Sequence, residues 1–390
     1  MKKKKKMKDE EFVYCAEKLT YVNNVQILVQ LNEEWRKSKV KCQAKDKYLY
    51  ILLENASVQT REIRVPIPYE ALCHVEYRMG EDHLFVKIPL EGKTIHPLLT
   101  EKERNLKVAT PSLERLKKDV LYCSKCGEKI VEGKKIEKIF PLPSKYWLEF
   151  SEMWVCCSNL HIPKNLPVDG KIKAKKGTLY DSTNYMLFNK EDICCDLKVQ
   201  EVSGEIDEEY LPVCCPCGNF LGKVDFDSFD KLRNSSKSFE SFKLNKYSLR
   251  SSTNLFSKFS FETHVSYELL SSAEAHDTFR FLVTCYESQK LYLLVNLINW
   301  DSCISTNEWH TTRYVPVLKL VFLDCTSQQH KEIASQWITQ FKVETITLME
   351  SECKMFIDLL NTNNKLFPPS GRIFKTTNSS MTVSCMRMSL

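Results

Sequence analysis

The chain has 390 residues, of which 43% are hydrophobic and 11% aromatic, a composition typical of a folded protein with more than one domain. Its net charge is +6, and the lysine run at residues 2–6 accounts for most of it, so the rest of the chain is close to neutral. This balance argues against direct nucleic-acid binding, and no apolar run is long enough to span a membrane.

Residues 1–120 are predicted to form a β-rich N-terminal domain. Four short runs, YVNNVQILVQL, KYLYILLENASV, REIRVPIPY and EDHLFVKIPL, are rich in β-branched and aromatic residues and alternate partially with polar ones. This pattern is typical of an antiparallel sheet or sandwich. The polar stretch 100–120 is expected to hold a short helix that leads into the next segment.

Residues 121–222 are a predicted zinc-binding segment, because nine of the seventeen cysteines lie between Cys123 and Cys217. The N-terminus lacks the apolar core and cleavage site of a secretory leader, so we expect the protein in the cytoplasm, with the nucleus as an alternative. Thiols stay reduced in both compartments. Metal ligands and free core thiols are therefore the two interpretations of these cysteines.

Two pairs of cysteines in this segment have the spacing of metal ligands. Cys123 and Cys126 (YCSKCGE), and likewise Cys214 and Cys217 (CCPCGNFLG), are separated by two residues and followed by glycine. Two such turns supply the four sulfurs of a structural zinc site. We therefore predict a zinc-ribbon-like site, with reduced core cysteines as the alternative. Cys215 lies inside the second pair and makes the ligand assignment ambiguous.

The stretch 141–157, PLPSKYWLEFSEMWVCC, ends in the adjacent cysteines Cys156 and Cys157. The sequence leaves four interpretations of this pair open. The thiols are buried beside tryptophans, form a second metal site with His161 or Cys194, provide a nucleophile, or are presented outward. A nucleophile is the least supported, because no base is evident nearby.

Residues 223–375 are predicted to form a C-terminal α+β domain, and residues 376–390 a loose tail. The Ser-, Lys- and Phe-rich stretch 233–260 is expected to be an exposed strand or partly ordered. Periodicity predicts helices at 255–273, 331–341 and 348–364, a hairpin at 278–298 and a strand at 315–324. The whole chain is thus expected to be α+β, mainly antiparallel, with a zinc-ribbon-like cysteine-rich middle segment and a few helices toward the C-terminus.

Four motifs carry a resemblance to a known family. In this order, YCSKCGE, PLPSKYWLEFSEMWVCC, CCPCGNFLGKV and TFRFLVTCYESQKLYLLVNLINWDS resemble the HECT-like ubiquitin-protein ligase E-three-D family, whose members bind a ubiquitin-conjugating enzyme. The resemblance implies a ubiquitin ligase whose partners are a ubiquitin-conjugating enzyme and ubiquitin. It also implies that the segment 250–270, with Phe256 and Phe259, contacts the conjugating enzyme. Packing of this segment in the chain's own core is the alternative.

A HECT ligase passes ubiquitin through a cysteine thioester, and no catalytic cysteine is identifiable from the sequence. Whether the chain is an enzyme therefore stays open, and a ligase that only brings a charged conjugating enzyme to its substrate also fits. The cysteines of the C-terminal part, which sit in unrelated contexts, are Cys285, Cys303, Cys325, Cys353 and Cys385.

The stretch 141–157 also resembles a motif of a BRAT-like partner of an Integrator-type endonuclease, in which the last cysteine ligates the endonuclease's zinc. The resemblance implies that Cys157 enters the zinc endonuclease of the mRNA 3′-end cleavage and polyadenylation machinery, as a non-catalytic inhibitor or chaperone. A thiolate at a catalytic zinc displaces the attacking water. Val155 separates the tryptophan from the cysteine pair, so Cys156 stays an alternative ligand. The residues implied in this contact, besides Cys157, are Pro141, Leu142, Pro143, Ser144, Trp147, Trp154 and Cys156.

Overall fold

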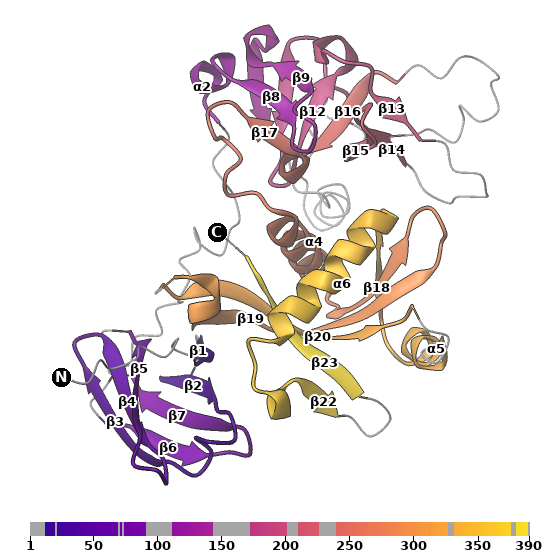
Figure 1. Ribbon diagram of the computed structural model, residues 1–390. Helices are drawn as coiled ribbons and strands as arrows, with labels where there is room; N and C mark the ends of the chain where they lie inside the picture. Colours follow the sequence, from indigo (N-terminus) through magenta and orange to yellow (C-terminus); the bar gives the residue numbers. More distant parts are fainter. Residues whose placement is uncertain are drawn as a thin grey trace, which may run out of the picture. The chain divides into compact units, whose positions relative to one another are not determined.

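The chain divides into two compact units in a computed structural model. Unit 1 comprises Met1–Arg104 and Glu268–Leu390, and unit 2 comprises Asn105–Tyr267. The fold is α+β and mostly antiparallel, as predicted (Figure 1). The predicted boundaries at residues 120, 222 and 375 follow composition and do not coincide with these limits. The structure describes residues 12–19, 22–68, 71, 74–90, 111–142, 172–200, 210–225, 239–311, 313–326, 331–375 and 380–388.

A ten-stranded sheet forms the centre of unit 1, in the order β22-β23-β20-β19-β1-β2-β7-β6, with β18 beside β19 and β21 beside β18. Strand β19 is 16 residues long, and it pairs with β18 through its first part and with β1 through its last part. The sheet therefore joins the first strand of the chain to the C-terminal strands. The strands are β1 (Tyr14–Leu19), β2 (Asn24–Gln30), β6 (Glu76–Met79), β7 (His83–Pro89), β18 (Arg280–Cys285), β19 (Leu291–Thr306), β20 (Val315–Asp324), β21 (Glu344–Leu348), β22 (Ile373–Lys375) and β23 (Ser380–Arg387).

A second, three-stranded sheet in unit 1 consists of β3 (Lys39–Lys45), β4 (Tyr48–Glu54) and β5 (Thr60–Pro66). Alternate residues of β2, β4 and β7 point into one shared core with Trp35, as the period of two of a half-buried strand requires. This packing confirms the antiparallel, sandwich-like arrangement predicted for the N-terminal strands. The core residues of these three strands are Val25, Ile27, Val29, Leu49, Ile51, Leu53, Leu84, Val86 and Ile88.

Two helices confirm the predictions for the C-terminal part, namely α5 (Lys331–Gln340) and α6 (Glu350–Asn364). The start of α6 is fixed by the Glu352 carboxylate, which accepts a hydrogen bond from the Met349 N–H at 3.0 Å. The apolar face of α6 is buried, with Cys353, Phe356 and Leu360 each 0% exposed.

The predicted loose tail is wrong for residues 380–387, which form β23 between β20 and β22. The side chain of Ser384 is 0% exposed and donates to the Leu360 carbonyl of α6 at 2.8 Å. The Asn363 amide of α6 donates to the Cys385 carbonyl, also at 2.8 Å. The strand contains a buried polar residue, Ser384, whose hydroxyl bonds the neighbouring helix, so its short apolar pattern did not identify it.

Unit 2 contains a seven-stranded sheet in the order β10-β11-β12-β16-β15-β14-β13 and a three-stranded sheet in the order β17-β8-β9. Strands β10 and β11 pair in parallel, and the other pairs are antiparallel. Apolar residues of both sheets share one core. The strands are β8 (Val120–Cys123), β9 (Lys129–Glu132), β10 (Lys138–Pro141), β11 (Thr178–Asp181), β12 (Tyr185–Asn189), β13 (Lys198–Val199), β14 (Tyr210–Cys214), β15 (Phe220–Asp225), β16 (Ser241–Asn245) and β17 (Leu249–Ser251).

Two further predicted helices are present, and one of them starts later than predicted. The short helix α2 (Leu113–Lys117) begins after Ser112, as expected for the stretch before β8. Helix α4 (Phe261–His276) starts several residues later than the apolar spacing predicts. Its start is set by Ser260 and Thr263, whose hydroxyls accept each other's backbone N–H at 3.1 and 3.0 Å. The Ser-rich stretch before α4 contains β16, which lies inside the sheet rather than on an exposed edge.

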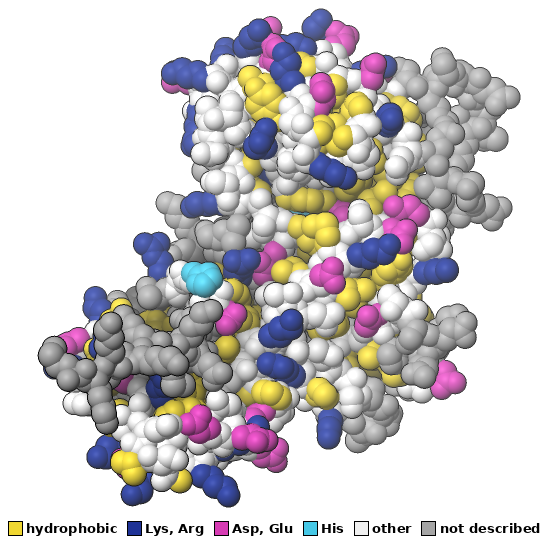
Figure 2. Space-filling model, in the orientation of Figure 1, with side chains coloured by type: hydrophobic (Ala, Val, Ile, Leu, Met, Phe, Trp, Pro, Cys, Tyr) yellow, Lys and Arg dark blue, Asp and Glu magenta, His cyan; other side chains and the backbone are white. Residues whose placement is uncertain are grey.

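Charged side chains are dispersed over the face drawn in Figure 2, where Lys and Arg lie among acidic and uncharged residues and form no single basic patch on that face. Within the described part of the chain, no helix has both the length and the apolar character needed to cross a membrane.

A candidate metal centre of four cysteines

Two turns of unit 2 carry four cysteines toward one point. The first cysteine turn, residues 123–128, joins β8 to β9 and carries Cys123 and Cys126. The second cysteine turn, residues 215–219, joins β14 to β15 and carries Cys215 and Cys217. A glycine follows the last cysteine of each turn, with φ of 77° at Gly127 and 80° at Gly218. Glycine adopts this left-handed backbone without steric cost, so each chain can turn back beside its thiols.

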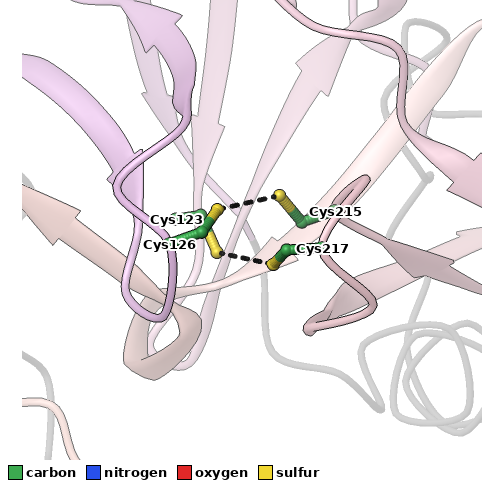
Figure 3. A group of neighbouring side chains, drawn as sticks. All are labelled: Cys123, Cys126, Cys215 and Cys217. Atoms are coloured by element: carbon green, nitrogen blue, oxygen red, sulfur yellow. Dashed lines mark hydrogen bonds between the residues drawn. The ribbon is translucent and has the colours of Figure 1, made fainter.

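The four sulfur atoms lie within 4.8 Å of one another (Figure 3). The Sγ atoms of Cys126 and Cys215 are 3.6 Å apart, and those of Cys123 and Cys217 are 3.9 Å apart. A tetrahedral zinc with Zn–S bonds of about 2.3 Å requires sulfurs about 3.8 Å apart, whereas a disulfide brings them to about 2.05 Å. The cluster therefore has the spacing of ligands around a single ion.

The second cysteine pair of the cluster differs from the predicted one, because Cys215 rather than Cys214 belongs to the cluster. Cys214 is the last residue of β14, and Cys215 is the residue directly after it. Adjacent residues of an extended chain direct their side chains to opposite sides, so only one of the two can face Cys217 and the first turn. Of the four cysteines predicted as ligands, Cys123, Cys126 and Cys217 lie in the cluster, and Cys214 does not.

The cluster is half enclosed by protein. Cys123 and Cys215 are each 0% exposed, whereas Cys126 and Cys217 are exposed. Burial raises the pKa of the Cys215 thiol, and the neighbouring thiols raise it further. A divalent cation reverses this preference, since metal binding releases the thiol protons. The arrangement thus suits a bound cation that neutralises closely spaced thiolates.

N–H groups of both cysteine turns point at the sulfurs. The backbone N–H of Glu128 donates to Cys126 Sγ at 3.4 Å, and the Asn219 side-chain amide donates to Cys123 Sγ at 3.5 Å. Hydrogen bonds of this kind stabilise thiolate ligands and fix their direction.

Asp119 stabilises the position of β8, the strand that leads into the first cysteine turn, by hydrogen bonds to the residues at the end of β17. Its side chain accepts hydrogen bonds from the hydroxyls of Ser251, Ser252 and Thr253 and from the Val120 N–H. These bonds tie the start of β8 to the end of β17. Burial by itself raises the pKa of Asp119, but the hydrogen bonds outweigh burial and hold this pKa below its usual value.

Several predicted site residues lie outside the part of the chain that the structure describes. Pro141 ends β10, and the Leu142 N–H donates to the Asp181 carbonyl at 2.7 Å, so the beginning of the stretch 141–157 is attached to the sheet. Pro141 and Leu142 belong to neither of the two cysteine turns. The residues outside the described ranges are Pro143, Ser144, Trp147, Trp154, Cys156 and Cys157.

Phe256 and Phe259, predicted to contact a conjugating enzyme, pack together in unit 2 with their ring centroids 6.0 Å apart. Phe256 is 6% exposed and belongs to the core, and Phe259 packs against that core while partly buried. This packing agrees with the core alternative.

Sequence reasoning missed Asn219 and Asp119 as supports of the site. Asn219 follows the glycine of the second turn directly, but its contact to Cys123 spans 96 positions and leaves no local signal. The contacts of Asp119 leave no local signal either, since its hydroxyl partners lie more than 130 positions away. The adjacent cysteines at 214 and 215 were the sequence feature that showed the assignment of the fourth cysteine to be ambiguous.

Comparison with known proteins gives the chain a family context. The family model described as HECT-like Ubiquitin-conjugating enzyme (E2)-binding matches residues 17–379. A Mus musculus protein named as the E3 ubiquitin-protein ligase E-three-D is 22% identical over 289 residues, which cover 68% of this chain and 72% of that protein. The Homo sapiens protein of the same name is 21% identical over 286 residues, with 64% and 69% covered.

An uncharacterized protein of Saccharomyces cerevisiae is similar over more of its length. It is 21% identical over 372 residues, which cover 92% of this chain and 95% of the yeast protein. No solved structure matches the chain significantly.

Proposed function

Because the chain belongs to the HECT-like ubiquitin-conjugating enzyme (E2)-binding family, we propose that it binds a ubiquitin-conjugating enzyme and promotes ubiquitination of a substrate protein. The family match from residue 17 to 379 takes in both units and supports the binding of a conjugating enzyme. The names of the mouse and human relatives support the ligase part of the proposal.

In this proposal the chain acts as a scaffold. The substrate lysine attacks the thioester between ubiquitin and the conjugating enzyme, an amide bond forms, and the enzyme's thiol leaves. The observation that carries this mechanism is the burial of every cysteine of the C-terminal part. The exposed fractions are 0% for Cys285, 3% for Cys303, 8% for Cys325, 0% for Cys353 and 0% for Cys385.

A cysteine that accepts ubiquitin must be reachable and readily deprotonated. Burial raises the pKa of Cys325 to about 11 and that of Cys353 to about 12, the opposite of activation. Within the described ranges, the exposed cysteines are Cys126 and Cys217, and both belong to the four-cysteine cluster. These features favour direct transfer over a thioester on any of the C-terminal or cluster cysteines.

A single-turnover discharge assay tests the proposal. A panel of conjugating enzymes is charged with ubiquitin, and loss of the thioester to free lysine is followed with and without the chain. We expect faster discharge with at least one enzyme and no ubiquitin adduct on this chain that dithiothreitol removes. No effect on any enzyme contradicts the ligase function, and a dithiothreitol-sensitive adduct contradicts the scaffold mechanism.

We propose further that Cys123, Cys126, Cys215 and Cys217 hold a zinc ion. Support comes from the all-sulfur donor set and from the 3.6 and 3.9 Å sulfur separations. Four protein ligands leave no open position for water, so such an ion would cross-link the two cysteine turns rather than catalyse a reaction. Its role would be to hold the β8–β9 and β14–β15 turns together.

A second candidate function rests on the stretch 141–157, as a plug for the 3′-end zinc endonuclease. The observation in its favour is the attachment of the stretch's start, where β10 pairs with β11 and the Leu142 N–H binds the Asp181 carbonyl. The test is capture of the endonuclease by wild type, Cys156→Ser and Cys157→Ser, with zinc content and circular dichroism of each. Loss in Cys157→Ser alone, with fold and zinc retained, supports the plug. Equal capture by all three contradicts it.

A further inference from the structure

Asn219 links the two cysteine turns by a hydrogen bond from its side-chain amide to a sulfur, beside the direct contacts between the thiols. Its backbone belongs to the second turn, where its carbonyl accepts the Cys215 N–H at 2.9 Å. Its side-chain amide reaches the first turn and donates to Cys123 Sγ at 3.5 Å. One residue thus shapes the loop that presents Cys215 and also holds the thiol of Cys123.

The charge of the proposed centre explains what this contact does. Four thiolates around a divalent cation carry a net charge of about −2, and N–H donors reduce the cost of keeping that charge inside protein. The other N–H donors to the four sulfurs are backbone groups, that of Glu128 to Cys126 Sγ and that of Cys217 to the Cys215 thiol, which any non-proline residue supplies. The Asn219 amide is a side-chain donor and so depends on residue type.

Lys198 of β13, which also contacts the second cysteine turn, provides a comparison. Its ammonium donates to the Pro216 carbonyl at 3.4 Å and therefore contacts the backbone of the second turn. No hydrogen bond to a cysteine sulfur is found for it in the described structure. Removing Lys198 changes the turn's surroundings without removing a donor to the ligands.

We infer that Asn219 is a positioning residue of the metal centre, which holds the Cys123 thiolate against the second turn and thereby sets the affinity for zinc. This inference rests on the proposed zinc site. Loss of a donor to a metal ligand typically weakens metal binding by about 10- to 100-fold. We expect Asn219→Ala to lie in this range and Lys198→Ala to match wild type.

The experiment uses the full chain and three variants, Asn219→Ala, Asn219→Gln and Lys198→Ala. Zinc affinity is measured by competition with a chromophoric chelator, and cobalt(II) is added as a spectroscopic probe. Circular dichroism at saturating zinc checks that each variant is folded. The inference predicts weaker zinc binding and a weaker or shifted sulfur-to-cobalt charge-transfer band in Asn219→Ala, with partial recovery in Asn219→Gln, which keeps an amide donor.

Three outcomes overturn the inference. Zinc affinity of Asn219→Ala equal to wild type shows that the amide does not position the ligand. Equal losses in the Ala and Gln variants show that Asn219 serves only the shape of the turn. A wild-type chain that binds neither zinc nor cobalt contradicts the zinc proposal itself, and that result is distinguished from the first two by the wild-type titration.

Discussion

Lys246 and Asp181 form a buried ion pair in unit 2, with 2.8 Å between Nζ and Oδ1 and each side chain 2% exposed. The ammonium also donates to the Ser182 carbonyl at 2.5 Å and lies 4.9 Å from the ring centroid of Phe259. Burial lowers the pKa of Lys246, and the Asp181 carboxylate opposes that shift. The pair joins the end of β11 to the residue after β16, on either side of β12.

Removing one partner of this pair leaves the other charge buried. Lys246→Met is expected to lower the free energy of unfolding by about 3–5 kcal/mol, because the Asp181 carboxylate loses its counter-charge. Urea denaturation at pH 7 measures this change. The matched control is Lys243→Met on β16, whose pair with Asp225 is about a third exposed and is expected to contribute less than about 1 kcal/mol. Similar effects in both variants would contradict the prediction.

The Asp119 carboxylate should make stability depend on acid pH. Its pKa is lower in the folded chain than the ordinary value of 3.8. Its contribution is therefore fully present above pH 3.8 and is lost as the pH falls through the folded-state value. Asp119→Asn is expected to cost about 2 kcal/mol at pH 7. In urea titrations the gap between wild type and variant should narrow below pH 3.8. A gap that stays constant with pH would rule out the ionised carboxylate as its origin.

Metal content distinguishes Cys215 from Cys214 as the fourth ligand. Cys215→Ser is expected to lower the zinc bound per chain and to weaken zinc affinity by more than about 10-fold, whereas Cys214→Ser should retain wild-type zinc. Elemental analysis of the purified chains, with chelator competition, measures both. Loss of zinc in Cys214→Ser with normal zinc in Cys215→Ser would restore the C-x2-C assignment.

Gly222 is required where β15 approaches β16. A Cβ atom at this position would lie 1.9 Å from the Lys243 carbonyl oxygen, so the two strands would have to separate. Gly222→Ala is expected to cost about 3 kcal/mol or more in urea denaturation. Gly371→Ala is the control, since its nearest neighbour would be Pro368 Cγ at 3.6 Å. A Gly222→Ala chain as stable as the control would contradict the close approach of the strands.

Local patterns predicted those features that local chemistry determines. The spacing of Cys123 and Cys126 and the glycine within each cysteine turn pointed to the cysteine cluster, and helical periodicity identified α5 and α6. The choice of Cys215 over Cys214 depends on where β14 ends, which spacing does not encode. Asn219 and Asp119 act through contacts about 100 or more positions away in sequence, so no window of neighbours could have revealed them.

Local patterns also failed to predict the start of α4 and the presence of β23. Apolar spacing suggested a helix from residue 255, but the hydroxyls of Ser260 and Thr263 fix its start at Phe261. Strand β23 was missed because its polar residue Ser384 is buried and bonded to α6. Both errors have one cause: a polar side chain found a specific partner that composition does not show.

The pairing of β1 with β19 has a consequence for the order of folding during synthesis. Strand β1 pairs with β2 as soon as both have been made, but Cys15 also lies opposite Thr306, so the ribosome must add almost 300 residues before β1 meets its second neighbour, β19. Residues 105–267 emerge in between and contain the whole of unit 2. Because domains fold as units while the chain is still growing, unit 2 can complete its core first. Until β19 has been made, the edge of β1 that faces away from β2 stays unpaired, and an unpaired strand edge is a site of aggregation.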